Sequence, residues 1–213
     1  MRDDSDHIGA IVRSLGRTEY EATWLAMRDF TARRGAEVRD EIWLTEHPPV
    51  YTVGLAGKVE HFPRGATAIP VVRTDRGGQI TYHGPGQVVA YTLVDLRRQR
   101  LGVRDYVRRL ESAMIELLQS HGISAHGKVD APGVYVRGAG VEAKIGALGL
   151  KVRNGCTYHG VALNVAMDLS PFASINPCGY PGLAVTQMRE LGVAAGATEV
   201  GNELGHQLQR MLG

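Results

Sequence analysis

The sequence has 213 residues, of which 44% are hydrophobic and 22% are charged, and these proportions exclude a disordered chain. A formal net charge of +2 excludes a strong overall attraction to nucleic acid. No apolar run approaches the roughly 18 residues of a membrane span, so we expect no membrane segment. The length predicts a single domain over residues 1–213, large enough to bury a core without disulfides or metals.

The hydrophobic pattern predicts three longer helices in a chain that otherwise consists mostly of strands. The first is expected over 18–33 with Ala22, Leu25 and Ala26 on one face. The second, Val103–Ser120, has apolar residues at i, i+3 and i+4 and ends at His121-Gly122. The third lies at the C-terminus and is expected to pack on the sheet. Strands are predicted at 41–44, 50–54, 69–74, 79–83, 88–96, 133–137, 141–152 and 158–165, and a short helix at 186–191.

The predicted strands outnumber the helices and follow one another in groups. This order favours an α+β fold with a mixed or mainly antiparallel sheet. Strands and helices do not alternate as a doubly wound sheet requires, and no stretch rich in Ser, Pro or Gly divides the chain. We therefore expect one sheet-and-helix domain.

The two cysteines are too few for a disulfide framework. The first residues are acidic, where a secretory signal would need basic residues and then an apolar stretch, so we expect a cytoplasmic protein. A thiol in a reducing compartment can be a nucleophile or a small core residue. Cys156, at the head of an apolar strand, is expected to be structural.

Cys178 lies in the turn sequence Asn-Pro-Cys-Gly-Tyr-Pro-Gly at 176–182. Pro177 fixes the backbone and Gly179 allows a sharp bend, so the turn can present the sulfur. The backbone amides on either side of Gly179 are candidates for binding an oxyanion. The alternative interpretation is a buried turn cysteine, because free cysteines are among the most buried residues.

Lys144 has small apolar neighbours, unlike Lys151, which stands two residues from Arg153. A thiol has a pKa of about 8.5 and needs a nearby base or cation to form a thiolate at neutral pH. Lys144 is a candidate for that role if its side chain points into a cleft. The alternative is a lysine at a strand edge whose amine reaches water.

A glycine-rich segment, Arg76–Gln87, lies between two predicted strands and matches no nucleotide-binding loop. Paired glycines there predict a hairpin whose backbone a ligand can approach closely. The tetrapeptide Thr-Tyr-His-Gly occurs at 81–84 and again at 157–160. Three interpretations of its histidines, His83 and His159, compete: metal ligands together with Cys178, acid–base groups, and hydrogen-bonded structural residues. The metal interpretation lacks the usual ligand spacing, and no metal is expected.

Arginines gather before and within the start of the second predicted helix. They form either a solvated face or a docking patch for an acidic partner. Single-stranded nucleic acid is a weaker alternative, because aromatic residues do not alternate with the arginines. The residues are Arg97, Arg98, Arg100, Arg104, Arg108 and Arg109.

Several blocks in this order resemble the octanoyl-[acyl carrier protein]:protein octanoyltransferases, also called the lipoate-protein ligase B family. Each block alone is weakly informative, but their joint order from about residue 41 to residue 191 is highly specific. The blocks are Glu-Ile-Trp-Leu at 41–44, the segment 76–87, Asp-Ala-Pro-Gly-Val-Tyr-Val at 130–136, Lys-Ile-Gly-Ala-Leu-Gly at 144–149, His-Gly-Val-Ala-Leu-Asn-Val at 159–165, Asp-Leu-Ser-Pro-Phe at 168–172 and Ile-Asn-Pro-Cys-Gly-Tyr at 175–180.

The resemblance implies a biotin/lipoyl protein ligase-like fold and a catalytic dyad of Cys178 and Lys144. It implies transfer of octanoyl from octanoyl-acyl carrier protein, through a cysteine thioester, to the target lysine of lipoyl domains. The acceptors would be 2-oxoacid dehydrogenase E2 subunits and the glycine cleavage H protein, and no cofactor, ATP or metal would be needed. A monomer is expected. The implied substrate-binding residues are Arg76, Gly77, Gly78, Gln79, Ile80, Thr81, Tyr82, His83, Ala147, Leu148, Gly149, Gly160, Val161 and Ala162.

Two alternatives stay open at this point. One is an ATP-dependent lipoate or biotin ligase on the same fold, although the Gly-Arg-Gly-Arg signature of biotin ligases is absent. The other is a non-catalytic module whose glycine-lined slot only holds a fatty acyl chain. The second alternative predicts acyl binding without covalent transfer.

Overall fold

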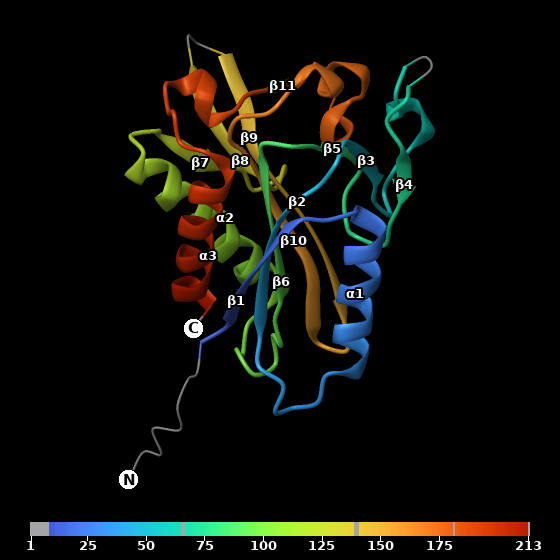
Figure 1. Ribbon diagram of the computed structural model, residues 1–213, viewed down its shortest axis with the longest axis vertical. Helices are drawn as coiled ribbons and strands as arrows, with labels where there is room; N and C mark the ends of the chain where they lie inside the picture. The colour runs from blue at the N-terminus through green and yellow to red at the C-terminus, as the bar shows by residue number, and fades with distance from the viewer. Residues whose placement is uncertain (1–8, 65–66, 139–140, 181, 213) are drawn as a thin grey trace.

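The computed structural model describes residues 9–64, 67–138, 141–180 and 182–212. A large sheet runs through the middle of the molecule, with helix α1 on one face and helices α2 and α3 on the other (Figure 1). The helices are α1 (Tyr20–Arg33), α2 (Val103–Ser120) and α3 (Ala197–Leu212), with short 3-10 helices η1 (Val59–His61), η2 (Ser170–Ser174), η3 (Pro177–Gly179) and η4 (Met188–Leu191).

The large sheet has the strand order β1-β2-β6-β10-β9-β8-β7, and β11 pairs with β9. Strands β1 and β11 pair in parallel with their neighbours, and the other pairs of this sheet are antiparallel. This confirms the predicted α+β fold with a mixed sheet. The strands are β1 (Ile11–Arg17), β2 (Glu41–Glu46), β6 (Gln87–Leu93), β7 (Ala125–Gly127), β8 (Val134–Gly138), β9 (Val141–Arg153), β10 (Cys156–Asn164) and β11 (Ala184–Val185).

A second sheet of order β4-β3-β5 lies beside the large one. Its core contains Tyr51 and Tyr82 and extends to Phe172 of η2. The small sheet thus connects the glycine-rich segment before β5 to the chain that leads into η3. Its strands are β3 (Val50–Val53), β4 (Val71–Arg73) and β5 (Ile80–His83).

Helix α2 has the bounds that its apolar spacing predicts. Leu110, Met114 and Leu117 are buried in the core between this helix, α3 and the sheet. The helix ends because Gly122 adopts a φ of 76°, which favours glycine. Within the described part of the chain, no helix combines the length and the apolar character that a bilayer crossing requires.

Helix α1 turns a different face to the sheet from the predicted one. Thr23 and Met27 are buried, whereas Leu25 is 56% exposed and Ala22 and Ala26 are exposed. The prediction was wrong because it took Ala22, Leu25 and Ala26 as the apolar face of the helix. The helix instead buries Tyr20 and Met27 in a hydrophobic cluster that includes Trp43 of β2 and Val89 and Leu93 of β6.

Strand β1 was not predicted from the sequence. It lies at the edge of the large sheet, and most of its side chains are exposed, so it lacks the apolar alternation of a half-buried strand. An ion pair from Arg13 Nε to Glu41 Oε2 (2.6 Å) links it to β2. Strands β7 and β11, with three and two residues, were also missed because they are too short to show a pattern.

Candidate active site

A cavity of about 300 Å³ is lined by β9, β10 and the glycine-rich segment 76–83, with side chains from α1 and α2 completing its wall. Its lining is mostly apolar, which is typical of a small-molecule site. All the residues named for substrate binding from the sequence lie around it except Tyr82, and Lys144 lies there as well. Residues that the sequence reasoning did not assign to the site also line it: Tyr20, Val89, Tyr91, Val103, Val107, Ala131, Pro132, Leu150 and Tyr180.

Glycine at position 149 opens the wall of the cavity. Gly149 pairs with Gly160 across β9 and β10, so neither strand places a side chain at this point. A methyl group on Gly149 would lie 3.0 Å from the Gly77 carbonyl oxygen and 3.3 Å from Arg76 Cδ. The absence of a Cβ therefore lets the segment 76–79 approach the sheet closely.

Arg76 holds this segment in shape. Its buried guanidinium donates hydrogen bonds to the carbonyl oxygens of Thr52 (2.6 Å), Gln79 (2.8 Å) and Gly77 (2.9 Å). The Gln79 carbonyl oxygen also accepts from the Gly54 N–H (3.1 Å), so the arginine adds to the backbone hydrogen bonds of this segment. Arg76 thus organises the backbone of the cavity wall, beyond any contact with a ligand.

Tyr82 does not line the cavity. Successive side chains of a strand point to opposite faces, and Thr81 and His83 take the cavity side of β5. The Tyr82 ring packs against Tyr51 (5.6 Å between centroids) and Phe172 (5.5 Å) in the core of the small sheet. Tyr82, which the resemblance implied to bind substrate, therefore stabilises the small sheet.

Lys144 is a buried lysine of β9, with 5% of its surface exposed. Its Nζ donates to the carbonyl oxygen of Pro132 (3.0 Å) and lies 5.2 Å from the centre of the Tyr135 ring. Lys144 is among the residues that line the cavity, which agrees with the interpretation of a lysine aimed into a cleft. A surface lysine reaching water is excluded by this burial.

The turn that carries Cys178 is η3, and it packs beside Lys144 and β5. Pro177 and Lys144 both line a second, small cavity of about 20 Å³, which also touches Thr81. A methyl group on Gly179 would lie 2.9 Å from Gln79 Cγ, which shows how closely the turn contacts the glycine-rich segment. The side chain of Cys178 lies outside the described residues, so its position relative to Lys144 stays a prediction.

The amides on either side of Gly179 are already used inside the turn. The Gly179 N–H donates to the Asn176 carbonyl oxygen (2.9 Å), and the Tyr180 N–H donates to the Pro177 carbonyl oxygen (3.1 Å). The expectation that these two amides bind an oxyanion was wrong, because a 3-10 turn consumes its own N–H groups in i to i+3 bonds.

His83 is a buried, neutral histidine of β5. Its Nδ1 is 2.7 Å from Gln87 Oε1 and its Nε2 is 3.3 Å from Thr52 Oγ1, and its ring stacks on Tyr20. Because the Gln87 oxygen only accepts, Nδ1 carries the proton and Nε2 accepts from the threonine hydroxyl. Burial lowers the pKa of His83 to about 3, so the ring stays uncharged at neutral pH.

This histidine gives a pH prediction. Unfolded His83 gains a proton below pH 6.5, its ordinary pKa, but the folded protein resists protonation down to about pH 3. We expect the free energy of unfolding to fall as the pH drops through this range, with His83 contributing up to about 1.4 kcal/mol per pH unit. Burial lowers the pKa of His47 and His159 as well, so they act in the same direction.

Urea unfolding between pH 7 and 4.5 measures the effect. His83→Gln should reduce the slope of the free energy of unfolding against pH. His206→Gln, at an exposed position of α3, should leave that slope unchanged. Equal slopes for the wild type and His83→Gln would contradict the prediction.

A second polar cluster centres on the partly buried Asp75 and includes His159, which lines the cavity. The carboxylate accepts hydrogen bonds from Trp24 Nε1 (2.9 Å), the Tyr158 hydroxyl (2.5 Å) and His159 Nε2 (3.0 Å). Although burial alone would raise the pKa of Asp75, these donors hold it well below its ordinary value. Asp75 therefore fixes α1 and β10 to the start of the glycine-rich segment.

His159 reaches Asp75 through an unusual backbone conformation. Its φ is 62°, in the left-handed region, inside a buried strand. As a result its ring lies beside that of Tyr158, 5.1 Å away, and both side chains contact the same carboxylate. Its Nδ1 is buried and has no hydrogen-bond partner among the described residues.

These contacts support the structural interpretation of both histidines. Over residues 9–64, 67–138, 141–180 and 182–212, no three His, Cys, Asp or Glu side chains gather in a way that could hold a metal ion. A proton-transfer role for His83 or His159 stays untested.

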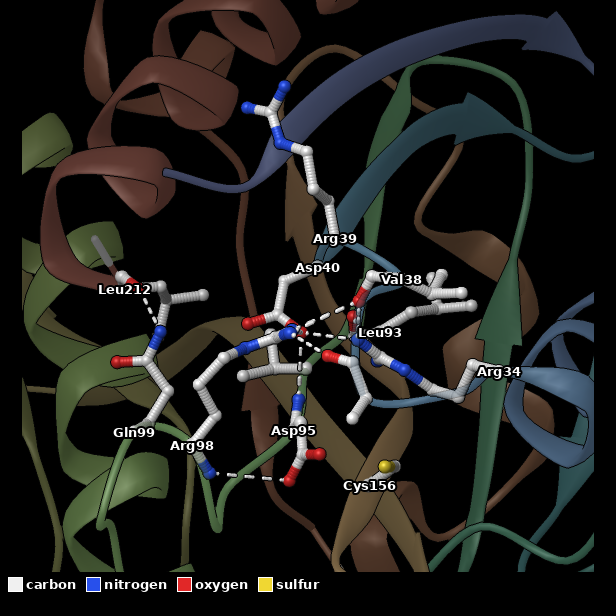
Figure 2. A network of polar contacts seen from close by, with 12 residues as sticks. Arg34, Val38, Arg39, Asp40, Leu93, Asp95, Arg98, Gln99, Cys156 and Leu212 are labelled. Carbon is white, nitrogen blue, oxygen red and sulfur yellow. Dashed lines mark hydrogen bonds and ion pairs between the residues drawn. The ribbon is translucent and has the colours of Figure 1, made fainter. Parts of the chain in front are cut away.

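The arginine cluster combines structural contacts with exposed side chains. Arg98 donates to Asp40 Oδ1 (2.6 Å) and to the Val38 carbonyl oxygen, and Arg34 donates to the same carboxylate oxygen (2.7 Å), as Figure 2 shows. Arg109 likewise donates to the Met211 carbonyl oxygen (2.9 Å) and fixes the end of α3. Arg97, Arg98, Arg100, Arg104 and Arg108 are all exposed, although Arg97 also pairs with Asp95 (3.2 Å), and Arg109 is partly buried.

Cys156 lies at the start of β10, within the same polar region (Figure 2). It is buried, it does not line the cavity, and burial raises the pKa of its thiol. A thiol of raised pKa forms little thiolate at neutral pH, which agrees with the structural role expected from the sequence.

The comparisons with known proteins agree with one another. A family model described as the lipoyl protein ligase A/B catalytic domain matches residues 19–209. An octanoyltransferase of Chromobacterium violaceum is 58% identical over 202 residues, which cover 95% of each chain. An octanoyltransferase of Thiobacillus denitrificans is 60% identical and covers 95% of this chain and 90% of its own.

Solved structures of lower identity share the fold. A bi-partite lipoate protein ligase from Thermoplasma acidophilum superposes with a TM-score of 0.76 at 17% identity, covering 97% of this chain and 84% of its own. The biotin protein ligase of Aquifex aeolicus superposes with a TM-score of 0.57 at 11% identity, covering 96% of this chain and 69% of its own. These likenesses confirm the predicted biotin/lipoyl protein ligase-like fold.

Proposed function

This chain belongs to the lipoyl protein ligase A/B catalytic domain family and is an octanoyltransferase of lipoate biosynthesis, and we propose that it works through a thioester on Cys178. The donor is octanoyl-acyl carrier protein, and the acceptor is the target lysine of lipoyl domains, on 2-oxoacid dehydrogenase E2 subunits and the glycine cleavage H protein. The observation that carries the proposal is the buried Lys144 amine, which lines an apolar cavity next to the turn of Cys178.

In the first half-reaction, the Cys178 thiolate attacks the carbonyl carbon of the octanoyl thioester. The Lys144 ammonium favours the thiolate by its charge. The bond between the carbonyl carbon and the phosphopantetheine sulfur breaks, and the leaving thiolate takes a proton from Lys144. The products are octanoyl-Cys178, a neutral Lys144 and the free carrier thiol.

In the second half-reaction, the amine of the acceptor lysine attacks the octanoyl-Cys178 carbonyl. Neutral Lys144 accepts the proton that this amine loses, and the carbon–sulfur bond breaks to regenerate the Cys178 thiolate. The result is an amide and the starting form of the enzyme. Conversion of a thioester to an amide is energetically downhill, so we propose that neither ATP nor another cofactor is used.

The cavity wall supports an acyl substrate. Gly149 and Gly160 face one another without side chains, and Ala147, Leu148 and Ala162 continue the apolar lining. Burying each methylene of an extended acyl chain there would contribute about 0.8 kcal/mol. We propose that the octanoyl chain lies along this wall with its carbonyl end toward Lys144.

We propose that the acyl carrier protein docks near the start of α2. Arg100 and Arg104 are exposed there, and Val103 and Val107 line the cavity, so a bound acidic carrier would lie near the entrance. We also propose that the protein acts as a monomer in the cytoplasm.

Intact-mass measurement tests the proposed intermediate. The purified protein is incubated with octanoyl-acyl carrier protein and no ATP. We expect one octanoyl increment, removed by hydroxylamine and placed on Cys178 by peptide mapping. The same sample should then transfer the group to a lipoyl domain in the absence of the donor.

Two results would contradict the proposal. Acceptor modification without any enzyme-bound octanoyl group would indicate direct transfer between the two carriers. Modification that requires ATP and free octanoate would indicate a ligase.

A further inference from the structure

Glu111 is a buried carboxylate of α2 that the proposed half-reactions do not use. Only 8% of its surface is exposed. Its Oε1 accepts a hydrogen bond from the Gly133 N–H at 2.8 Å, in the chain segment that precedes β8. A buried charge needs such a partner, because its desolvation is otherwise expensive.

The peptide bond that contacts Glu111 also contacts Lys144. The carbonyl oxygen of Pro132 and the N–H of Gly133 belong to one peptide unit. The oxygen accepts from Lys144 Nζ (3.0 Å) while the N–H donates to Glu111. In a trans peptide these two groups point in opposite directions, so the unit lies between the carboxylate and the amine.

The orientation of this peptide suits both charges. Its N–H end faces the carboxylate and its carbonyl end faces the amine, so each charge strengthens the hydrogen bond at the other end. Burial raises the pKa of Glu111, and the Gly133 hydrogen bond and the charge of Lys144 oppose that rise. The carboxylate and the amine are thus linked by contacts and by charge.

Gly133 allows the peptide to come this close to the lysine. Its φ is 145°, which L side chains rarely adopt. A methyl group at this position would lie 2.5 Å from Lys144 Cε and 2.7 Å from Lys144 Nζ. The segment therefore rests directly on the end of the lysine side chain, and a displacement of the segment would displace the amine.

Other charged groups surround the pair. Arg108, one turn earlier on α2, acts on Glu111 through its charge. Glu142 of β9 pairs with His126 of β7 and with Lys128, which follows β7. Lys128 Nζ lies 4.8 Å from the centre of the Tyr135 ring that Lys144 also contacts. Lys128 therefore brings a second positive charge near Lys144, and the carboxylate of Glu142 pairs with Lys128 and compensates this charge.

We propose that Glu111 is a positioning residue of the octanoyl transfer, which holds the Lys144 amine at the cavity and stabilises its protonated form through the peptide bond between Pro132 and Gly133. This inference rests on the proposed role of Lys144. It assigns to α2 a part in the chemistry, in addition to its packing against the sheet.

Glu111→Gln separates charge from shape, because the amide oxygen of glutamine can still accept from the Gly133 N–H. The measurement is the pH titration of the ¹³Cε signal of Lys144 in lysine-labelled protein, assigned with Lys144→Arg. We expect the Lys144 amine to titrate about one pH unit lower in Glu111→Gln than in the wild type. The alkaline limb of the rate of acyl-enzyme formation should move in the same direction.

Glu116→Gln is the matched control. Glu116 lies on the same helix but contacts Gln207 of α3, so its neutralisation should leave the titration of Lys144 unchanged. If Glu111→Gln does not fold, Glu111→Asp replaces it. The shorter side chain keeps the charge, so Lys144 should titrate as in the wild type while the acylation rate falls.

The outcomes distinguish this inference from the proposed function. An unchanged Lys144 titration in Glu111→Gln, or one shifted equally in Glu116→Gln, would overturn the inference while acylation of Cys178 still stood. A shifted titration in Glu111→Asp with an unchanged rate would also overturn it. A wild-type protein that forms no octanoyl-Cys178 would instead refute the proposed function, whatever the titration of Lys144.

Discussion

Replacing Cys178 by alanine is expected to abolish formation of the octanoyl-enzyme and to reduce octanoyl transfer by about 10³-fold or more. The reason is that a thioester needs a cysteine, and Cys156, the other of the two cysteines in the sequence, does not line the cavity. The turn should persist in the variant, because it is built from Pro177 and from backbone hydrogen bonds of Asn176 and Gly179. Intact mass and transfer to a lipoyl domain measure the two effects.

Cys156→Ala is the matched control for this experiment. Its thiol is buried at the far end of β10 and does not line the cavity, so the variant should be acylated like the wild type. An octanoyl increment that persists in Cys178→Ala and disappears in Cys156→Ala would reverse the assignment of the nucleophile.

Lys144→Met should leave the fold intact and slow acyl-enzyme formation by about 10²- to 10⁴-fold. Methionine preserves an unbranched side chain in the buried space but removes the amine that favours the thiolate and transfers the proton. The remaining rate should increase with pH, because the Cys178 thiol must then ionise without a neighbouring cation. Single-turnover acylation across pH 6 to 10 measures both the rate and its pH dependence.

Lys151→Met provides the comparison, since Lys151 lies on the same strand but does not line the cavity. It should retain the wild-type rate and pH profile. A wild-type rate in Lys144→Met would contradict the proposed dyad and would favour a module that only binds acyl chains.

Much of the fold could be predicted because local patterns and tertiary packing agree. The apolar spacing of α2 predicted its bounds, and Gly122 supplied a stop signal that depends only on the backbone. The strands of the central sheet were predicted where buried residues run together, as in β6. The order of motifs predicted the family because it sums many weak signals along the chain.

The remaining features depend on contacts that the chain order does not reveal. The buried face of α1 is set by Tyr20 and Met27, which join a hydrophobic cluster of the sheet, whereas Leu25 of the same helix is exposed. Glu111 and Asp75 appear in the sequence as ordinary acidic residues on a helix and before a glycine-rich segment. They become part of the site only when folding brings them to Gly133 and His159, which are distant in sequence.

The left-handed residue of β10 also shows why a repeated motif is not a repeated structure. The tetrapeptide Thr-Tyr-His-Gly forms an ordinary strand end in β5, where Tyr82 and His83 point to opposite sides, one into the core of the small sheet and one to the cavity. In β10 the same four residues direct Tyr158 and His159 to one carboxylate, and here the histidine has a φ of 62°, whereas His83 has no positive φ. The same tetrapeptide thus adopts two different structures. In the second copy its tyrosine and histidine contact Asp75, a residue outside both copies.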